Sequence, residues 1–216
     1  MIQRQLRLLF FQGDALLGAF SFFALALFCA SLAIGPQENV LRQSAPGILW
    51  ILFILTTLFS MPLLLKGEAK EGLLDEIVLH PSPAAFYLLS KIGAEWLLIG
   101  LPLIALGILL SPLFSLSNPQ SLRLALTLLI SFPALSGLGI LGGLLTLNAR
   151  GGGILLAFLI LPLTIPLFLF GLSIFEMIQF GLDSSAAFCL LTSVSILLVM
   201  LSVAIGSWAL RFAVEG

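Results

Sequence analysis

Long apolar runs separated by short polar connections extend along the whole chain. Six such runs lie at about 15–34, 45–65, 86–111, 122–147, 154–175 and 187–210. A helix rises about 1.5 Å per residue and the hydrocarbon core of a bilayer is about 30 Å thick, so each run is long enough to cross a membrane. The pattern predicts an all-α polytopic membrane protein with six transmembrane helices, folded as a single transmembrane domain over residues 1–216.

The first polar segment and the first connection predict two further features. Residues 2–12 are short and basic, with Arg4 and Arg7, and apolar at one end, which is typical of an interfacial helix lying on the cytoplasmic leaflet. After the first run, Gly35 and Pro36 predict a sharp break in the helix.

The fifth run differs from the others because it contains two prolines, Pro162 and Pro166. Each proline removes a backbone donor and disfavours helix in the residue before it. Broken helix at membrane depth is tolerated only where protein or a wet cavity covers it. One interpretation is that the second half of this run re-enters the outer leaflet as a short helical hairpin, and a single kinked span is the alternative.

Composition supports the membrane assignment and adds an orientation. The chain is 60% hydrophobic and 9% charged, with a mean hydropathy of +1.22, whereas about a quarter of residues in soluble domains are charged. Cytoplasmic connections are enriched in Lys and Arg, and this rule predicts that both termini are cytoplasmic. On that orientation the inside residues are Arg4, Arg7, Lys66, Lys70, Lys91, Arg150 and Arg211, and the outside residues are Arg42 and Arg123.

Several kinds of chemistry have no motif in the sequence. No glycine-rich phosphate-binding loop with its Lys-Ser or Lys-Thr pair occurs, so we do not expect the chain to hydrolyse ATP by itself. His80 is the single histidine, which leaves no histidine cluster for a metal ion. We therefore expect no enzyme activity and no cofactor bound by this chain alone. The net charge of −1 gives no reason to expect nucleic acid as a partner.

Charge is concentrated in one part of the chain, and residues 66–83 form its centre. Of 9 Lys+Arg and 10 Asp+Glu, eight lie between Lys66 and Glu95. Within this segment Leu73, Leu74, Ile77 and Val78 share one helical face, and acidic residues lie elsewhere on the surface. The pattern predicts a short amphipathic helix on the cytoplasmic side that suits a groove on a soluble partner. A solvated loop is the alternative.

Two charged residues near the start of the third span form a second candidate site. Lys91 and Glu95 are four residues apart, which places their side chains on one helix face. Ionisable residues inside a membrane are functional by default, although the argument is weaker at the interface. We predict an ion pair at the membrane edge and leave its role open between structure and function.

Three stretches carry a resemblance to a known family. The first contains Gly35 and Pro36, followed by Pro46 and Gly47. The second contains Glu71, Gly72, Leu74, Asp75, Glu76, Leu79 and Pro81. The third runs from Arg150, Gly151 and Gly152 to the segment that holds Pro162 and Pro166. Over essentially its full length, the sequence resembles the haem exporter protein B (CcmB) family, the membrane subunits of ABC-type complexes for cytochrome c maturation.

The resemblance implies a fold, a location and a set of partners. The fold would be that of ABC-2-type exporters, with an N-terminal interfacial helix, six spans and a re-entrant outer hairpin, in the bacterial inner membrane. Two copies would work with two ATP-binding cassette subunits, a haem-handling membrane subunit and a small tether protein. ATP would bind to the cassette subunit, and haem would be the substrate of the complex. Residues 66–83 would contain the coupling helix that contacts the ATPase, with Glu71, Gly72, Leu74, Asp75, Glu76, Leu79 and Pro81.

The function implied is haem export or handling to the periplasm in the biogenesis of c-type cytochromes. In one mechanism, ATP-driven movement of the coupling helices passes the substrate across through this subunit. In the other, the chain is a mechanical coupler that releases a haem-loaded chaperone from a partner subunit without itself translocating haem. The sequence leaves both mechanisms open.

Overall fold

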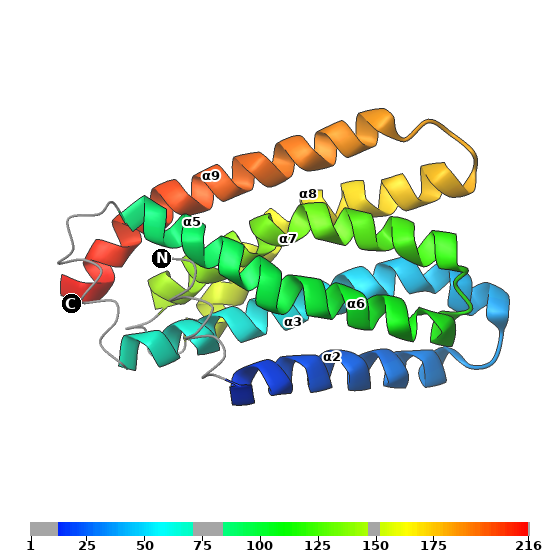
Figure 1. The fold of residues 1–216 in the computed structure, drawn as a ribbon, viewed down its shortest axis with the longest axis horizontal. Helices are drawn as coiled ribbons and strands as arrows, with labels where there is room; N and C mark the ends of the chain where they lie inside the picture. The colour runs from blue at the N-terminus through cyan, green and yellow to red at the C-terminus, as the bar shows by residue number, and fades with distance from the viewer. Residues whose placement is uncertain (1–12, 71–83, 147–151, 216) are drawn as a thin grey trace.

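The computed structural model describes residues 13–70, 84–146 and 152–215, and every regular element within these ranges is a helix (Figure 1). The elements are α2 (Gly13–Ile34), α3 (Glu38–Lys70), α5 (Ala84–Glu95), the π-helix η1 (Trp96–Gly100), α6 (Leu101–Leu110), the 3-10 helix η2 (Ser111–Phe114), α7 (Asn118–Thr146), α8 (Gly152–Gln179) and α9 (Ser185–Glu215). The predicted interfacial helix at 2–12 and the part of the charged segment from 71 to 83 lie outside the described residues.

The long helices run side by side along one axis of the molecule (Figure 1). The end of α3, the start of α5, the end of α7, the start of α8 and the end of α9 lie together at one end of this bundle. The turns after α2, η2 and α8 lie at the other end. Six helical segments are long and apolar enough to cross a membrane, with α5, η1, α6 and η2 together forming the third. The all-helical, six-span prediction is therefore confirmed.

Glycines mark two of the turns at the end of the bundle opposite Lys70 and Ala84. Gly35 adopts a φ of 88° directly after α2, and Gly181 adopts a φ of 69° between α8 and α9. Both values lie in the left-handed region, which glycine adopts without a steric penalty. The break predicted at Gly35-Pro36 is present, but α3 begins at Glu38, well before the expected residue 45. Residues 66–70 likewise continue α3 and do not form a connection.

The fifth apolar run forms one continuous helix, α8, so the re-entrant hairpin expected there is wrong. Pro162 and Pro166 both lie inside α8, and the chain turns only at Gly181. Each proline removes one hydrogen bond, whereas unwinding the helix would expose many backbone groups to an apolar environment. Between the two prolines, Thr164 Oγ donates to the Leu161 carbonyl at 2.8 Å. The helix therefore continues through both prolines, because keeping its other backbone hydrogen bonds outweighs the unfavourable effect of each proline.

Helix α7 occupies the centre of the bundle. It contacts α3, α5, η1, α6, α8 and α9, and 72% of its apolar window is buried, against 22% for α2 and for α9. Around it the structure has a large apolar cluster, in which Phe53 packs edge-to-face on Phe132 with ring centroids 5.7 Å apart. A smaller cluster lies where α3, α5, α7 and α9 meet near the Lys70 end; its buried members are Leu65, Tyr87, Leu88, Ile92, Ile140, Leu144, Ala209 and Leu210.

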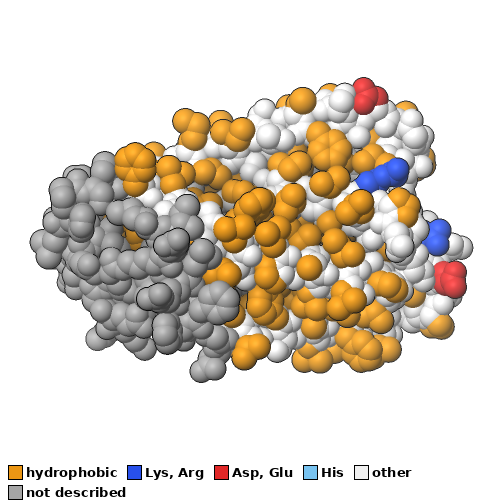
Figure 2. Space-filling view, viewed as in Figure 1, with side chains coloured by type: hydrophobic (Ala, Val, Ile, Leu, Met, Phe, Trp, Pro, Cys, Tyr) orange, Lys and Arg blue, Asp and Glu red, His pale blue; other side chains and the backbone are white. Residues whose placement is uncertain are grey.

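The outer surface matches a protein that lies in lipid. Figure 2 shows hydrophobic side chains spread over the described part of the face in view, and the charged side chains coloured there lie at the end of the bundle away from the grey residues. Inside the bundle, hydroxyl groups bond to carbonyls of their own helix, as for Thr57 to Phe53 and Ser131 to Thr127, both at 2.8 Å. Such bonds satisfy a buried hydroxyl without a partner on another helix. A buried hydroxyl that bonds to a different helix therefore marks a specific polar contact between two helices.

Candidate functional site

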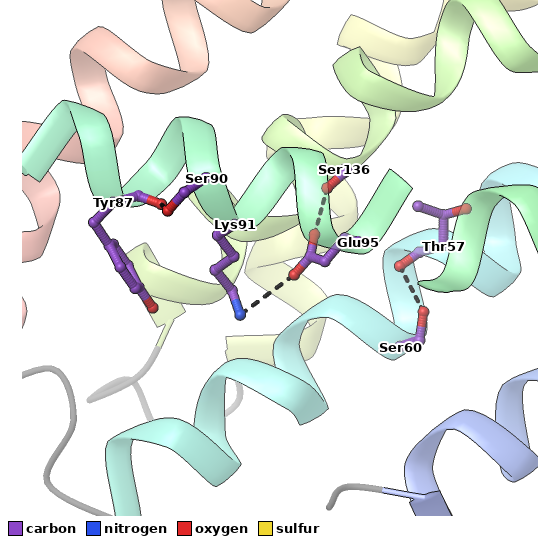
Figure 3. Close-up of polar contacts among 7 residues, drawn as sticks. All are labelled: Thr57, Ser60, Tyr87, Ser90, Lys91, Glu95 and Ser136. Atoms are coloured by element: carbon purple, nitrogen blue, oxygen red, sulfur yellow. Dashed lines mark hydrogen bonds and ion pairs between the residues drawn. The ribbon is translucent and has the colours of Figure 1, made fainter. Parts of the chain in front are cut away.

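A buried ion pair lies on α5. Lys91 Nζ is 3.4 Å from Glu95 Oε1, and neither side chain has exposed surface. The spacing of four residues places both on the face of α5 shown in Figure 3. The ion pair expected from the sequence is present, but it is enclosed between helices and not exposed at an edge. Since an ion pair taken out of water needs further hydrogen bonds to offset its desolvation, the surroundings of Glu95 matter.

Ser136 on α7 supplies such a hydrogen bond. Its Oγ donates to Glu95 Oε2, so the carboxylate joins α5 to α7 across 41 positions of sequence (Figure 3). Hydrogen bonds to an ionised group are stronger than those between neutral groups. The three side chains of Lys91, Glu95 and Ser136, called here the charge cluster, form a directed polar link between two transmembrane helices.

The backbone changes its geometry directly after Glu95. Residues Trp96–Gly100 form the π-helix η1, and the N–H of Leu101 donates to the Trp96 carbonyl five residues earlier. This segment lies close to α7. A methyl group added to Gly100 would be only 2.8 Å from the Phe132 ring. Single π-helical turns inside α-helices occur frequently at functional sites. The charge cluster thus lies at the boundary between regular and widened helix.

Helix α7 carries its own irregularity one turn away from Ser136. Pro133 has no N–H, so the carbonyl of Leu129 cannot receive its usual hydrogen bond from position 133. Trp96 Nε1 donates to that carbonyl at 3.2 Å. The next carbonyl, that of Ile130, accepts Ser195 Oγ from α9 at 2.8 Å. Side chains from two neighbouring helices therefore bind the turn that Pro133 opens.

The charge cluster also marks the boundary between the two apolar clusters. Leu88 and Ile92 of α5 belong to the smaller cluster, near the Lys70 end. Ala94 and Ile99 belong to the large cluster. Glu95 thus bonds to α7 at the point where α5 passes from one packed block to the other.

A second feature is an apolar groove of about 280 Å³ between α3 and α8. Its lining residues are Ile51, Ile54, Leu55, Leu161, Pro162, Thr164, Ile165 and Phe168. Behind it, Trp50 packs edge-to-face on Phe168 with centroids 6.4 Å apart, and its ring lies against Gly171. Trp50 Nε1 is buried without a hydrogen-bond partner in the described part of the chain. Shape, and not hydrogen bonding, holds this contact together.

The structure describes some of the site residues predicted from the sequence and does not describe others. The coupling residues Glu71, Gly72, Leu74, Asp75, Glu76, Leu79 and Pro81, together with Arg150 and Gly151, lie outside the described residues. Gly35 and Pro36 form the turn between α2 and α3, Pro46 and Gly47 lie within α3, Gly152 begins α8, and Pro162 and Pro166 lie within α8. Gly35 and Gly152 are at opposite ends of the bundle, so these family positions do not form one site (Figure 1).

Sequence reasoning missed the partners of the ion pair. Neither Ser136 nor the Trp96 hydrogen bond was expected. Pro133, which leaves a carbonyl of α7 without its usual donor, is a signal for the Trp96 bond, whereas the sequence carries no signal for Ser136. Within residues 13–70, 84–146 and 152–215, no group of three or more His, Cys, Asp or Glu side chains is placed to hold a metal ion.

Six long apolar helices, with α7 at their centre, define a multi-pass membrane protein. The sequence profile of the CcmB protein family matches residues 1–215. Heme exporter protein B of Pseudomonas aeruginosa is 36% identical over 206 residues, covering 94% of this chain and 91% of that protein. The protein of the same name from Haemophilus influenzae is 34% identical over 215 residues, covering 100% and 97%. In Escherichia coli K12, heme exporter protein B is 31% identical over 166 residues, covering 77% and 76%.

The chain therefore belongs to the CcmB family.

Proposed function

We propose that this chain is the transmembrane subunit of an ABC-type complex that exports or handles haem for the biogenesis of c-type cytochromes. The observation that carries the proposal is the similarity over nearly the whole chain to proteins named heme exporter protein B. The six apolar helices support it, since a subunit of this kind works within a membrane. The location would be the bacterial inner membrane, with both termini in the cytoplasm.

The energy for this function would come from a separate subunit. The chain has no phosphate-binding loop, so ATP would bind to a cassette ATPase that docks on its cytoplasmic side. The working unit would contain two copies of this chain and two ATPase subunits, with a haem-handling membrane subunit and a small tether protein. Haem is then a substrate of the complex, and this chain needs no cofactor of its own.

The ATPase would dock on residues 66–83, where the sequence combines an apolar helical face with Glu71, Asp75 and Glu76. Reversing these three charges to lysine should weaken ATPase docking and cytochrome c maturation while leaving membrane insertion intact. Reversal of Glu38 and Glu176, which are exposed at the opposite end of the bundle, is the matched control. Normal docking and maturation in the triple variant would overturn the assignment of this segment.

Two mechanisms satisfy the proposed function, and the charge cluster favours one. A transporter would pass haem through this subunit, whereas a mechanical coupler would use ATP-driven movement to release a haem-loaded chaperone from a neighbouring subunit. Lys91, Glu95 and Ser136 bond to one another between α5 and α7, and the groove at α3 and α8 has no charged lining residue. The bond from Ser136 to Glu95 thus connects two helices, as a coupler requires, and these polar groups do not line the groove.

The function itself is tested by removing the chain from cells. Without it, c-type cytochromes should lack covalently bound haem and the ATPase subunit should leave the membrane fraction; the wild-type chain should restore both. Haem-stained gels of the cytochromes and immunoblots of the membranes provide the measurement. Normal cytochrome c maturation in cells without the chain would contradict the proposal.

A further inference from the structure

The buried charge cluster suggests how movement passes through the protein. We propose that Glu95 is a positioning residue that transmits movement from the start of α5 to α7 through its bond to Ser136. The inference rests on the proposed function, because the movement would originate in the ATPase partner. Three structural observations support it: the place of the cluster between two packed blocks, its directed bonding, and the irregular helix next to it.

The smaller apolar cluster connects the two helix ends that flank residues 71–83. Leu65 lies near the end of α3, and Tyr87 and Leu88 lie near the start of α5; all three are buried in this cluster. Packed interiors are dense and deform little, so such a cluster moves as a block. A force on the 71–83 connection would therefore displace the α5 start together with the parts of α7 and α9 that belong to the cluster.

Glu95 lies where the smaller apolar cluster, which moves as a block, meets the large apolar cluster. Apolar contacts have no fixed direction, whereas the bond between Glu95 and Ser136 does, so this bond fixes the register of α5 on α7. Lys91 holds the carboxylate from one turn earlier, with Nζ 3.4 Å from Oε1. Because the site is shielded from water, these interactions are stronger than they would be at the surface.

Both linked helices have an irregular segment adjoining this link. On the α5 side, the π-helix Trp96–Gly100 ends with an i to i−5 bond from the N–H of Leu101, and such a segment can take up a change of register. On the α7 side, Pro133 interrupts the regular bonding three residues before Ser136. A displacement of the block would be absorbed at these two segments. The Glu95–Ser136 bond then decides whether the movement of the block reaches the part of α7 that lies in the large apolar cluster.

The first test replaces the ion pair with apolar side chains of similar size, Lys91→Met with Glu95→Leu, in the assembled complex. Such replacements of a buried pair are often neutral or stabilising, so the complex should still assemble and hydrolyse ATP. We expect the yield of mature cytochrome c per ATP hydrolysed to fall about ten-fold, a size typical of coupling between distant sites. An unchanged yield per ATP in an assembled complex would overturn the proposal.

The second test uses a pair of matched serines on α7. Ser136→Ala removes the hydroxyl that binds Glu95, whereas Ser131→Ala removes an equally buried hydroxyl that bonds only to Thr127 of the same helix. We expect Ser136→Ala to lower the yield per ATP and Ser131→Ala to leave it unchanged. Equal yields in the two variants would overturn the proposal, even if the double variant of the first test failed to assemble.

These outcomes are distinguishable from failure of the proposed function. If the wild-type complex does not support cytochrome c maturation at all, the proposed function fails. If wild-type maturation depends on the chain and on ATP, but neither test changes the yield per ATP, only the role of Glu95 fails. Loss of packing alone would reduce assembly, and so would lower ATP hydrolysis and maturation together without changing their ratio.

Discussion

Helices α7 and α8 both contain prolines in their interiors, and they accommodate them differently. In α7, Pro133 opens a turn whose carbonyls accept hydrogen bonds from Trp96 and Ser195, which belong to other helices. In α8, Pro162 lines an open apolar groove, and Pro166 follows four residues later in the same helix. The described side chains from Ile160 to Gln179 make hydrogen bonds only within α8.

The difference follows from where the two helices lie. The apolar window of α7 is 72% buried and that of α8 is 33% buried, so polar side chains from several directions can reach α7 alone. The α8 contact with α3 depends instead on shape, with the Trp50 ring packed on Gly171 and Phe168. A proline in a membrane helix can thus be stabilised by hydrogen bonds from neighbouring helices or by steric fit, and these two modes respond to different mutations.

The largest effect is expected at the steric contact of α8. A methyl group on Gly171 would overlap the rigid indole of Trp50, so Gly171→Ala should reduce the free energy of unfolding by about 1–3 kcal/mol, as overpacking typically does. Thermal unfolding in detergent measures the change. Gly93→Ala is the control, because a methyl group there would meet no atom within 4 Å. Equal melting temperatures for Gly171→Ala and the wild type would contradict the steric account.

At α7 the expected effect is a coupling between Trp96 and Pro133. Trp96→Phe should lower the free energy of unfolding by about 1–2 kcal/mol more than the loss of buried apolar area does, because it leaves the Leu129 carbonyl without a donor. In a Pro133→Ala background that cost should disappear, because the N–H of residue 133 can then bond to the same carbonyl. Unfolding of the four proteins of this double-mutant cycle gives the coupling energy. Additive effects would show that the indole does not replace the missing backbone donor.

A smaller difference is expected between two hydroxyl groups beside the prolines. Ser195 bonds across to Ile130 of α7, whereas Thr164 bonds only within α8. Ser195→Ala should therefore destabilise the protein by about 0.6 kcal/mol, the mean for hydrogen bonds between membrane helices, and Thr164→Val should have almost no effect. Chemical denaturation of both variants in the same detergent shows which substitution lowers the free energy of unfolding more. The reverse order would contradict the contrast drawn between α7 and α8.

The smallest effect is expected at the turn after α8. Asp183 accepts hydrogen bonds from the backbone N–H and the hydroxyl of Ser185, each at 2.9 Å, and these bonds hold its pKa below the ordinary value of 3.8. A depressed folded pKa means that the stabilisation is fully present above 3.8 and is lost as the pH falls through the folded pKa. Protection of the amides at the start of α9, measured against their intrinsic exchange rate at each pH, should therefore fall at low pH. Asp183→Ala should abolish this pH dependence, and an unchanged dependence would exclude Asp183 as its source.

The sequence predicted the features that depend on composition and local spacing. The apolar runs predicted six helices, Gly35-Pro36 predicted a turn, and the spacing of Lys91 and Glu95 predicted an ion pair. Features that depend on contacts between distant residues were not predictable, because nothing in the sequence near Glu95 indicates Ser136. The hairpin predicted at Pro162 and Pro166 was wrong because proline propensity is a local preference. In lipid, the remaining backbone bonds of α8 outweigh it.

The most direct test of the proposed role uses the whole complex with its ATPase partner inactivated. The quantity to measure is the fraction of the periplasmic haem chaperone that carries haem, alongside the amount of mature cytochrome c. If this chain couples ATP use to release, haem-loaded chaperone accumulates while cytochromes c stay unmatured. An empty chaperone in cells with an intact haem supply would contradict the coupling role and would show that haem delivery itself requires the ATPase.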